Sequence, residues 1–392
     1  MKHLRTFLRS SLAFVFASQL AHGAVKLKAV ALPSAEGTIV GTGFSPDSTR
    51  IAIVRYVIGR DASNARHTIQ IVDLKGGREI SQADLPDEES SYTAASPHFI
   101  MYSFDGRYLL LATTGSDVLL ILDAIKLQVL TRIVLYPETH NRRRLSGEGN
   151  RNFQGAVRVA VASNAELFGV LTHDGQAGVN EIFIGSFSSR QIIRSWILGD
   201  GRARTELGQT SLSLSKDGSR TAVSVVPPDG DHLPKDFNNL RLYKSDSGEL
   251  IEAVRTDGLV GQMALMPDDG VIASRIDTPG LFSKKLCIEK WNLSTKALTT
   301  KFCDAGRHVL FLGTSSAAGL VAGFACKIHK NIEGNVYSLP GRIDVWDMKS
   351  GALIAFSEEF PKAFPDIQIS PNGSWLSANQ MLWQIGSNTQ PQ

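Results

Sequence analysis

One short turn pattern recurs along the chain at intervals of about 50 residues, and it constrains the fold more than any other feature. Its seven copies are the segments 45–48, 103–106, 163–166, 215–218, 267–270, 315–318 and 370–373. Most copies combine Ser with Pro, Asp, Asn or Gly, and those at 163 and 315 are degenerate. Pro presets φ, Asp and Asn bond their own backbone, and Gly accepts positive φ. Because apolar segments flank each copy, each predicts a tight turn between two β-strands.

A third apolar segment follows each turn after a loop of variable length. These segments are 67–73, 117–123, 181–186, 239–245, 285–292, 342–347 and 380–385. Several lead into a second polar turn, such as 74–77, 245–248 and 348–351, and then into a fourth segment. Four short strands per unit, repeated seven times, predict an all-β fold. It is a seven-bladed β-propeller with four-stranded antiparallel blades.

The sixth unit resembles a WD repeat. Arg307-His308 stands where that family has Gly-His, and Trp346-Asp347 closes the third strand as the family's Trp-Asp does. The other units match more weakly, and the Ser-Pro-Asp turns are equally similar to propellers of periplasmic translocation and oligopeptidase proteins. The resemblance covers nearly all of the chain after its leader. It implies that the loops between strands two and three, and those between blades, share one face of a ring.

The two ends of the repeat predict how the ring closes. The seventh unit has only three strands before a polar tail at 387–392, and residues 25–32 form an apolar segment that belongs to no unit. We expect this N-terminal strand to complete the last blade, because closure leaves no exposed sheet edge. The predicted propeller domain is therefore 24–386.

Residues 1–23 have the pattern of a secretory signal. A basic stretch with Lys2, Arg5 and Arg9 precedes an apolar run to Leu20, and small residues follow, ending at Gly23. An uncleaved anchor is the alternative, but the run has about half of the ~20 residues that a bilayer span requires. We expect a cleaved leader, a secreted or periplasmic protein, and no transmembrane span after cleavage.

Charge argues against one class of partner. The chain has 41 Lys and Arg against 38 Asp and Glu, and the leader contains three of the basic residues, so 41 − 3 = 38 remain to balance 38. Nucleic-acid binders normally carry a basic surplus that replaces counterions on the phosphates. We therefore expect no nucleic-acid partner.

The chain contains three cysteines, and an oxidising compartment permits one intramolecular bridge between them. Cys287 and Cys303 flank a short turn at 294–295 on two strands that should pair, which makes them the favoured couple. A register slip of one residue would put their sulfurs on opposite faces of the sheet. Three buried thiols, including Cys326, remain the alternative.

The long connections are the predicted binding site, because loops on a rigid scaffold commonly carry binding residues. They are the segments 56–66, 87–97, 135–155, 227–238, 275–284 and 327–340. The third of these holds Arg142, Arg143 and Arg144, whose guanidinium groups match carboxylate, sulfate or phosphate. It also holds Tyr136 and Phe153, which offer contact area to a partner. We choose these five as candidate partner-binding residues.

Two alternatives apply to those residues. The neighbouring loop carries three carboxylates at 87–89, which can neutralise the arginines across the rim. The aromatic rings can pack their loop onto its own blade instead of contacting a partner.

No catalytic, haem, nucleotide or metal-binding motif occurs in the sequence. We expect no cofactor, no metal and no catalytic residue. The favoured function is a monomeric, secreted or periplasmic, non-catalytic scaffold that binds a protein or peptide through its long-loop face. Two alternatives stay open. One is a lactonase- or dehydrogenase-like enzyme with a site in the central channel, and the other is a carbohydrate or cell-envelope binder.

Overall fold

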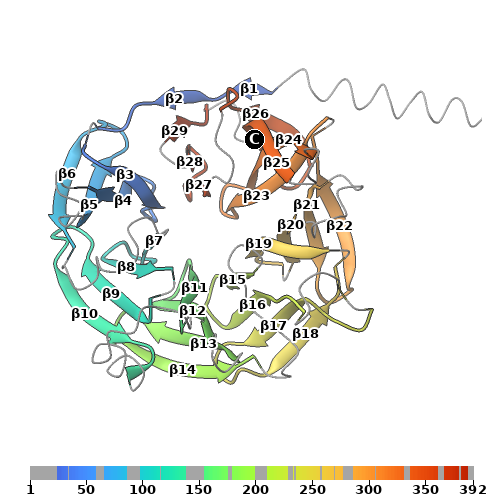
Figure 1. Cartoon of the computed structure of the whole chain (residues 1–392), viewed down its shortest axis with the longest axis horizontal. Helices are drawn as coiled ribbons and strands as arrows, with labels where there is room; N and C mark the ends of the chain where they lie inside the picture. The colour runs from blue at the N-terminus through green and yellow to red at the C-terminus, as the bar shows by residue number, and fades with distance from the viewer. Residues whose placement is uncertain are drawn as a thin grey trace, which may run out of the picture.

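The computed structural model forms a ring of seven β-sheets, with the blades in chain order around it (Figure 1). It describes residues 24–33, 35–58, 66–85, 98–114, 116–137, 154–174, 179–198, 210–227, 233, 235–256, 258–268, 270–276, 286–304, 306–330, 336–360, 366–378 and 381–386. All regular elements among these residues are β-strands, as the sequence predicts. The predicted seven-bladed, antiparallel propeller is confirmed.

The first four blades each consist of four consecutive strands, each strand hydrogen-bonded to the next. Blade 1 contains β3 (Thr38–Phe44), β4 (Arg50–Val57), β5 (Arg66–Asp73) and β6 (Glu79–Asp84). Blade 2 contains β7 (His98–Tyr102), β8 (Tyr108–Thr113), β9 (Val118–Asp123) and β10 (Val129–Val134). Blade 3 contains β11 (Gln154–Val161), β12 (Leu167–Asp174), β13 (Val179–Ser186) and β14 (Gln191–Ile197). Blade 4 contains β15 (Ser211–Leu214), β16 (Arg220–Ser224), β17 (Leu240–Lys244) and β18 (Leu250–Val254).

The last three blades include the two N-terminal strands. Blade 5 contains β19 (Leu259–Leu265), β20 (Gly270–Ile276), β21 (Ile288–Asn292) and β22 (Ala297–Phe302). Blade 6 contains β23 (His308–Ser315), β24 (Leu320–Lys330), β25 (Val336–Asp347), β26 (Leu353–Phe356) and β1 (Val25–Lys26). Blade 7 contains β27 (Ile367–Ile369), β28 (Trp375–Ala378), β29 (Met381–Gln384) and β2 (Lys28–Val30).

The N-terminal strands close the ring in two steps. β2 pairs antiparallel with β29, with Lys28 opposite Gln384, so it supplies the fourth strand of blade 7 as predicted. β1 pairs parallel with β26 and adds an unpredicted fifth strand to blade 6. Leu27 links the two strands, is buried, and donates its backbone N–H to the Phe356 carbonyl at 2.7 Å. It packs in the core shared by blades 6 and 7, so one short segment joins both blades.

Seven hydrophobic clusters fill the ring, one at each junction between neighbouring blades. Side chains of a strand alternate between its two faces, so each blade contributes to both of its junctions. In β25, Ile343 and Val345 belong to the cluster shared with blade 7, whereas Trp346 belongs to the cluster shared with blade 5. The ring is therefore continuously packed.

The recurrent turn is built on one pair of side chains. In blade 4, Ser215 Oγ donates to Asp217 Oδ1 at 2.6 Å and accepts the Arg220 N–H at 2.9 Å. The same arrangement occurs in blades 1, 2 and 7. Gly218 has a φ of 73°, in the left-handed region where glycine is favoured. These contacts explain why Ser, Asp or Asn, and Gly recur at fixed positions, since each satisfies one requirement of the turn.

Cys287 and Cys303 form the favoured disulfide, with an S–S distance of 2.05 Å and a Cα–Cα distance of 4.9 Å. Ile288 pairs with Phe302 in the adjacent register, which places the two cysteines opposite each other. Cys326 is a buried free thiol. The structure therefore contains one disulfide and one free thiol, and not the three buried thiols of the alternative prediction.

Some predictions fall outside this description. The predicted leader 1–23 and the tail 387–392 lie outside the described residues. Within the described part of the chain, no helix has the length and apolar character needed to cross a bilayer.

Candidate functional site

The long connections do leave one face of the ring. Strands alternate in direction within each blade, so connections between strands two and three emerge on the same side as those between blades. The two longest connections between described strands are 135–153, between blades 2 and 3, and 225–239, between strands two and three of blade 4, so both are of this kind. Turns on the opposite face are short, for example 45–49 and 124–128. We call the two sides the long-connection face and the tight-turn face.

Tyr136 lies at the base of the longest connection and is held against blade 3. Its hydroxyl lies 2.7 Å from Thr172 Oγ1, and its ring meets Phe183 edge-on at 5.5 Å between centroids. These contacts suit a residue that anchors the start of the loop, which is the packing alternative raised from the sequence.

The other four candidate residues, Arg142, Arg143, Arg144 and Phe153, lie outside the described residues. Their predicted role in binding stays a prediction.

A charged network occupies the long-connection side of the junction between blades 5 and 6. Arg342 donates from Nε to Asp344 Oδ1 at 2.7 Å and from Nη2 to Asp304 Oδ2 at 3.1 Å. Arg307 forms an ion pair with Glu359 from the connection after blade 6. The network therefore ties two interblade connections to the third strand of blade 6.

Asp344 is the unusual member of this network, because its side chain is fully buried. Its Oδ2 makes no hydrogen bond with any described residue. Burial raises the pKa of Asp344 to about 7; Arg342 opposes the shift, and the Asp304 carboxylate adds to it. Sequence reasoning missed this residue, although the charged pair Arg342 and Asp344, two positions apart in an apolar strand, was a usable signal.

The central channel holds a cavity of about 410 Å³ lined by the inner strands of several blades. Asp366 and Gln368 line it, and Gln368 Nε2 donates to the Thr42 carbonyl at 2.7 Å. Desolvation raises the pKa of Asp366, whereas Gln368 and Arg158 act in the opposite sense. Burial lowers the pKa of Arg158. The lining of this cavity thus includes the Asp366 carboxylate and the Gln368 amide, and Arg158 interacts electrostatically with Asp366.

The described residues contain no group of three or more His, Cys, Asp or Glu side chains placed to hold a metal ion.

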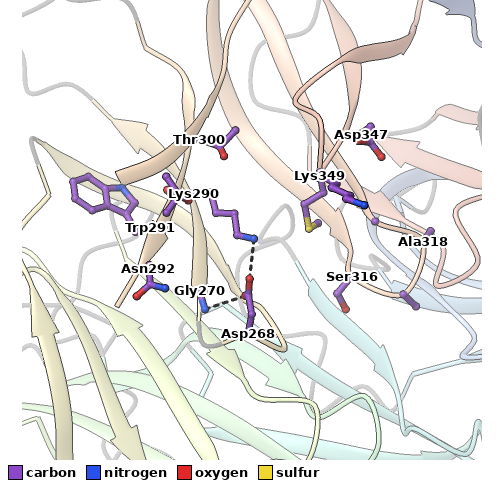
Figure 2. A pocket seen from close by; sticks show the side chains of 14 residues that line it. Asp268, Gly270, Lys290, Trp291, Asn292, Thr300, Ser316, Ala318, Asp347 and Lys349 are labelled. Atoms are coloured by element: carbon purple, nitrogen blue, oxygen red, sulfur yellow. Dashed lines mark hydrogen bonds and ion pairs between the residues drawn. The ribbon is translucent and has the colours of Figure 1, made fainter. Parts of the chain in front are cut away.

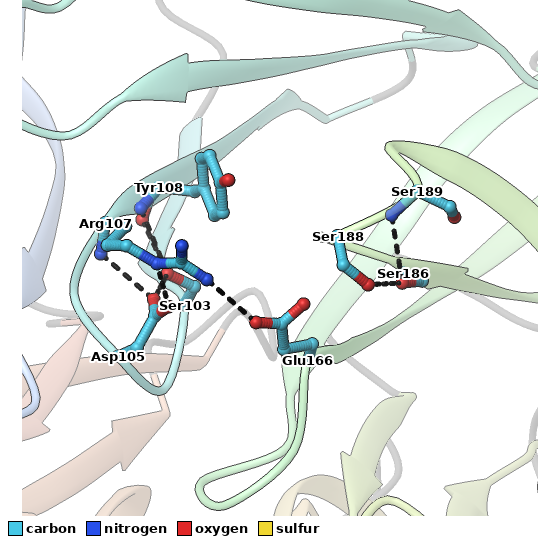
Figure 3. A network of polar contacts seen from close by, with 8 residues as sticks. All are labelled: Ser103, Asp105, Arg107, Tyr108, Glu166, Ser186, Ser188 and Ser189. Carbon is cyan, nitrogen blue, oxygen red and sulfur yellow. Dashed lines mark hydrogen bonds and ion pairs between the residues drawn. The ribbon is translucent and has the colours of Figure 1, made fainter.

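On the tight-turn face, side chains of blades 2 and 3 contact each other across their junction, and Figure 3 shows Arg107 of blade 2 reaching Glu166 of blade 3. Arg107 Nη2 lies 2.9 Å from Glu166 Oε1 and links the first turns of the two blades. Tyr108 stacks on Phe187, with ring centroids 6.2 Å apart and planes 3° from parallel. Arg107 and Arg190 also lie over the Tyr108 ring. Aromatic rings and guanidinium groups from both blades therefore contact one another at this junction.

Comparisons with known proteins identify the fold. No family model and no curated protein matches the sequence. Among solved structures, that of U3-55K superposes with a TM-score of 0.59 at 12% identity, over 91% of this chain and 98% of that one. In all, 1097 chains of solved structures match, and so widely shared a fold does not specify a function. At this identity the likeness establishes a propeller and leaves the WD-repeat family as a resemblance.

Proposed function

We propose that the protein is a non-catalytic, monomeric scaffold that binds a protein or peptide partner on its long-connection face. The observation that carries the proposal is the asymmetry of the ring. A closed, packed framework has its long connections on one side and only short turns on the other. Long loops on a rigid framework are where binding residues concentrate. The arginines 142–144 lie within the longest connection and suit an acidic segment of the partner.

We further propose that the protein works outside the cytoplasm, in the periplasm or after secretion. The leader-like residues 1–23 support this location. The Cys287–Cys303 disulfide supports it independently, because such bonds persist in oxidising compartments and are rare in the cytosol.

The test is affinity capture from the exported fraction with the chain from Val25 onward. The first variant replaces 140–144 with Gly and Ser, and the matched control replaces Ile125 and Lys126, which lie in a tight turn on the opposite face. We expect a partner that wild type and control retain and that the loop variant loses. Adding salt should weaken the capture, because the proposed contacts are ionic.

Equal retention by all three proteins, or no retained protein at all, would count against this function. The channel enzyme would then be the next candidate, and Asp366→Asn with Arg158→Gln would be the variants for a hydrolase and oxidoreductase screen.

A further inference from the structure

One turn position distinguishes the junction between blades 5 and 6 from the other junctions on the tight-turn face. It is the residue that closes the first turn of each blade and faces the junction with the next blade. The residues there, from blade 1 to blade 7, are Arg50, Tyr108, Leu167, Arg220, Gly270, Leu320 and Trp375. Blade 5 alone has glycine, so this position contributes no side chain to the junction between blades 5 and 6.

The turn of blade 5 is also one residue shorter than its counterparts. Met266 N donates to the Gly270 carbonyl, whereas Ser103 N donates to the Tyr108 carbonyl, one residue further along. A Cβ atom on Gly270 would lie 2.9 Å from Asp268 Oδ1 and 3.2 Å from the Trp291 carbonyl oxygen, so a side chain does not fit without displacement. The short turn therefore depends on glycine.

Blade 6 has small residues on its side of the same junction. Its first turn is the degenerate copy at 315–318, where Ser316, Ala317 and Ala318 stand in place of the usual Pro, Asp and Gly. A cavity of about 620 Å³ opens between the two blades, lined by three tight turns and the strands next to them (Figure 2). Two departures from the repeat, one in each blade, thus coincide at one junction.

The cavity has cationic groups on both sides. Lys290 comes from blade 5 and Lys349 from blade 6, on opposite sides of the opening (Figure 2). Lys290 Nζ lies 2.9 Å from Asp268 Oδ2. This contact uses one of the three hydrogen-bond donors of the Lys290 ammonium group. Lys349 is exposed and forms no ion pair within the described part of the chain.

The carboxylates of the lining are already engaged by their own turns. Asp268 Oδ1 accepts the Gly270 N–H at 3.1 Å, and Asp347 Oδ1 accepts the Ser350 N–H at 2.6 Å. Both carboxylates keep further lone pairs, but the Lys349 ammonium group has no ion-pair partner among the described residues, and this unpaired positive charge favours an anionic ligand.

We propose that this cavity binds a small organic anion, a carboxylate or phosphate attached to a polar scaffold. The two lysines would hold the anionic group, and Thr300, Ser316 and Asn292 offer hydrogen bonds to the rest of the ligand. The volume falls within the ~300–1,000 Å³ typical of small-molecule sites. The site lies on the tight-turn face, so it is separate from the partner-binding face proposed above.

The test is isothermal titration calorimetry with four probes: citrate, glucose 6-phosphate, inorganic phosphate and neutral glucose. We expect citrate or glucose 6-phosphate to bind at least tenfold more tightly than inorganic phosphate and glucose. The two organic probes distinguish the sources of the anionic group, because one supplies carboxylates and the other a phosphate. Lys349→Glu should weaken binding at least tenfold, which corresponds to about 1.4 kcal/mol.

The repeat offers a matched control. Lys75 occupies the same turn position in blade 1, two residues after Asp73 as Lys349 is after Asp347. Lys75→Glu changes the net charge equally, so it should leave binding unchanged. Gly270→Ala is a second test, because its Cβ intrudes on the Lys290–Asp268 pair, with thermal unfolding as the check on folding.

Several results would overturn the proposal: no binding of either organic anion at millimolar concentration, equal binding of neutral glucose, or an equal loss of affinity in Lys75→Glu and Lys349→Glu.

Discussion

The junctions between blades 2 and 3 and between blades 5 and 6 show how one repeat unit gives two different surfaces. At the first junction, Tyr108, Phe187 and Phe168 form a continuous aromatic contact that fills the tight-turn side. At the second, the position of Tyr108 is taken by Gly270 and the position of Phe187 by Met348. The framework hydrogen bonds are the same, because Phe187 N and Met348 N each donate to a carbonyl of the first turn in their blade. Backbone regularity therefore fixes the ring, and side-chain size decides which junction can hold a ligand.

The largest effect should come from removing the aromatic contact. Phe187 is fully buried and touches two other rings, so Phe187→Ala should lower the free energy of unfolding by about 3–5 kcal/mol. The equivalent change Met348→Ala should cost about 2 kcal/mol, because Met348 already borders a cavity and loses fewer contacts. Chemical denaturation of both variants measures the difference. Equal losses would show that the two junctions are packed alike.

The second prediction concerns pH and applies to the blade 5–6 junction. The pKa of Asp344 is raised to about 7 in the folded protein, from 3.8 for the free side chain. Between these values the folded state holds a proton that the unfolded state has lost, so stability is greatest below pH 4 and falls as pH rises to 7. The expected loss is on the order of 4 kcal/mol, because each unit of pKa difference corresponds to about 1.4 kcal/mol.

Asp344→Asn should remove this dependence. The amide keeps an oxygen that can accept the Arg342 Nε–H and carries no charge at any pH. Stability would be measured from pH 4 to 8 in wild type and variant. A wild-type slope that survives in Asp344→Asn would assign the titration to another group.

The smallest effect should come from the surface ion pair at the blade 2–3 junction. The Arg107 and Glu166 side chains are 62% and 28% exposed, and solvent screens their attraction. Glu166→Gln should shift the midpoint of thermal unfolding by no more than about 2 °C, and the shift should vanish in high salt. A large shift that high salt removes would mean that the ion pair contributes more to this junction than is expected of an exposed pair.

Most of the fold could be predicted because the repeated turn has a strict local chemistry. Ser, Asp and Gly at fixed spacing satisfy the same hydrogen bonds in each blade, so the pattern is readable without knowledge of neighbours. The strand that completes blade 7 could be predicted because the seventh repeat has only three strands of its own. The fifth strand on blade 6 did not, because β1 has only two residues and no signal distinguishes it from β2.

The candidate sites were less predictable. The cavity at Gly270 depends on two features: which turn position faces the next blade, and a first turn that is one residue shorter than in the other blades. Neither feature can be recognised until the three-dimensional arrangement of the blades is known. The sequence did mark the degenerate turn at 315–318, which forms the other wall of that cavity. The sequence did contain the charged pair Arg342 and Asp344, but the pKa of Asp344 is raised mainly by burial and further by Asp304, and both arise only on folding.

The pairing of β2 with β29 also has a kinetic consequence. Its partners, such as Lys28 and Gln384, have the widest sequence separation among the strand pairs that the structure describes. The N-terminal strand therefore cannot pair until residues near 384 have been synthesised, and contacts of such wide separation form slowly. Until then, the two unfinished blades present unpaired strand edges. An exported chain would pass through this interval after translocation, which makes it the stage of folding most exposed to proteolysis and aggregation.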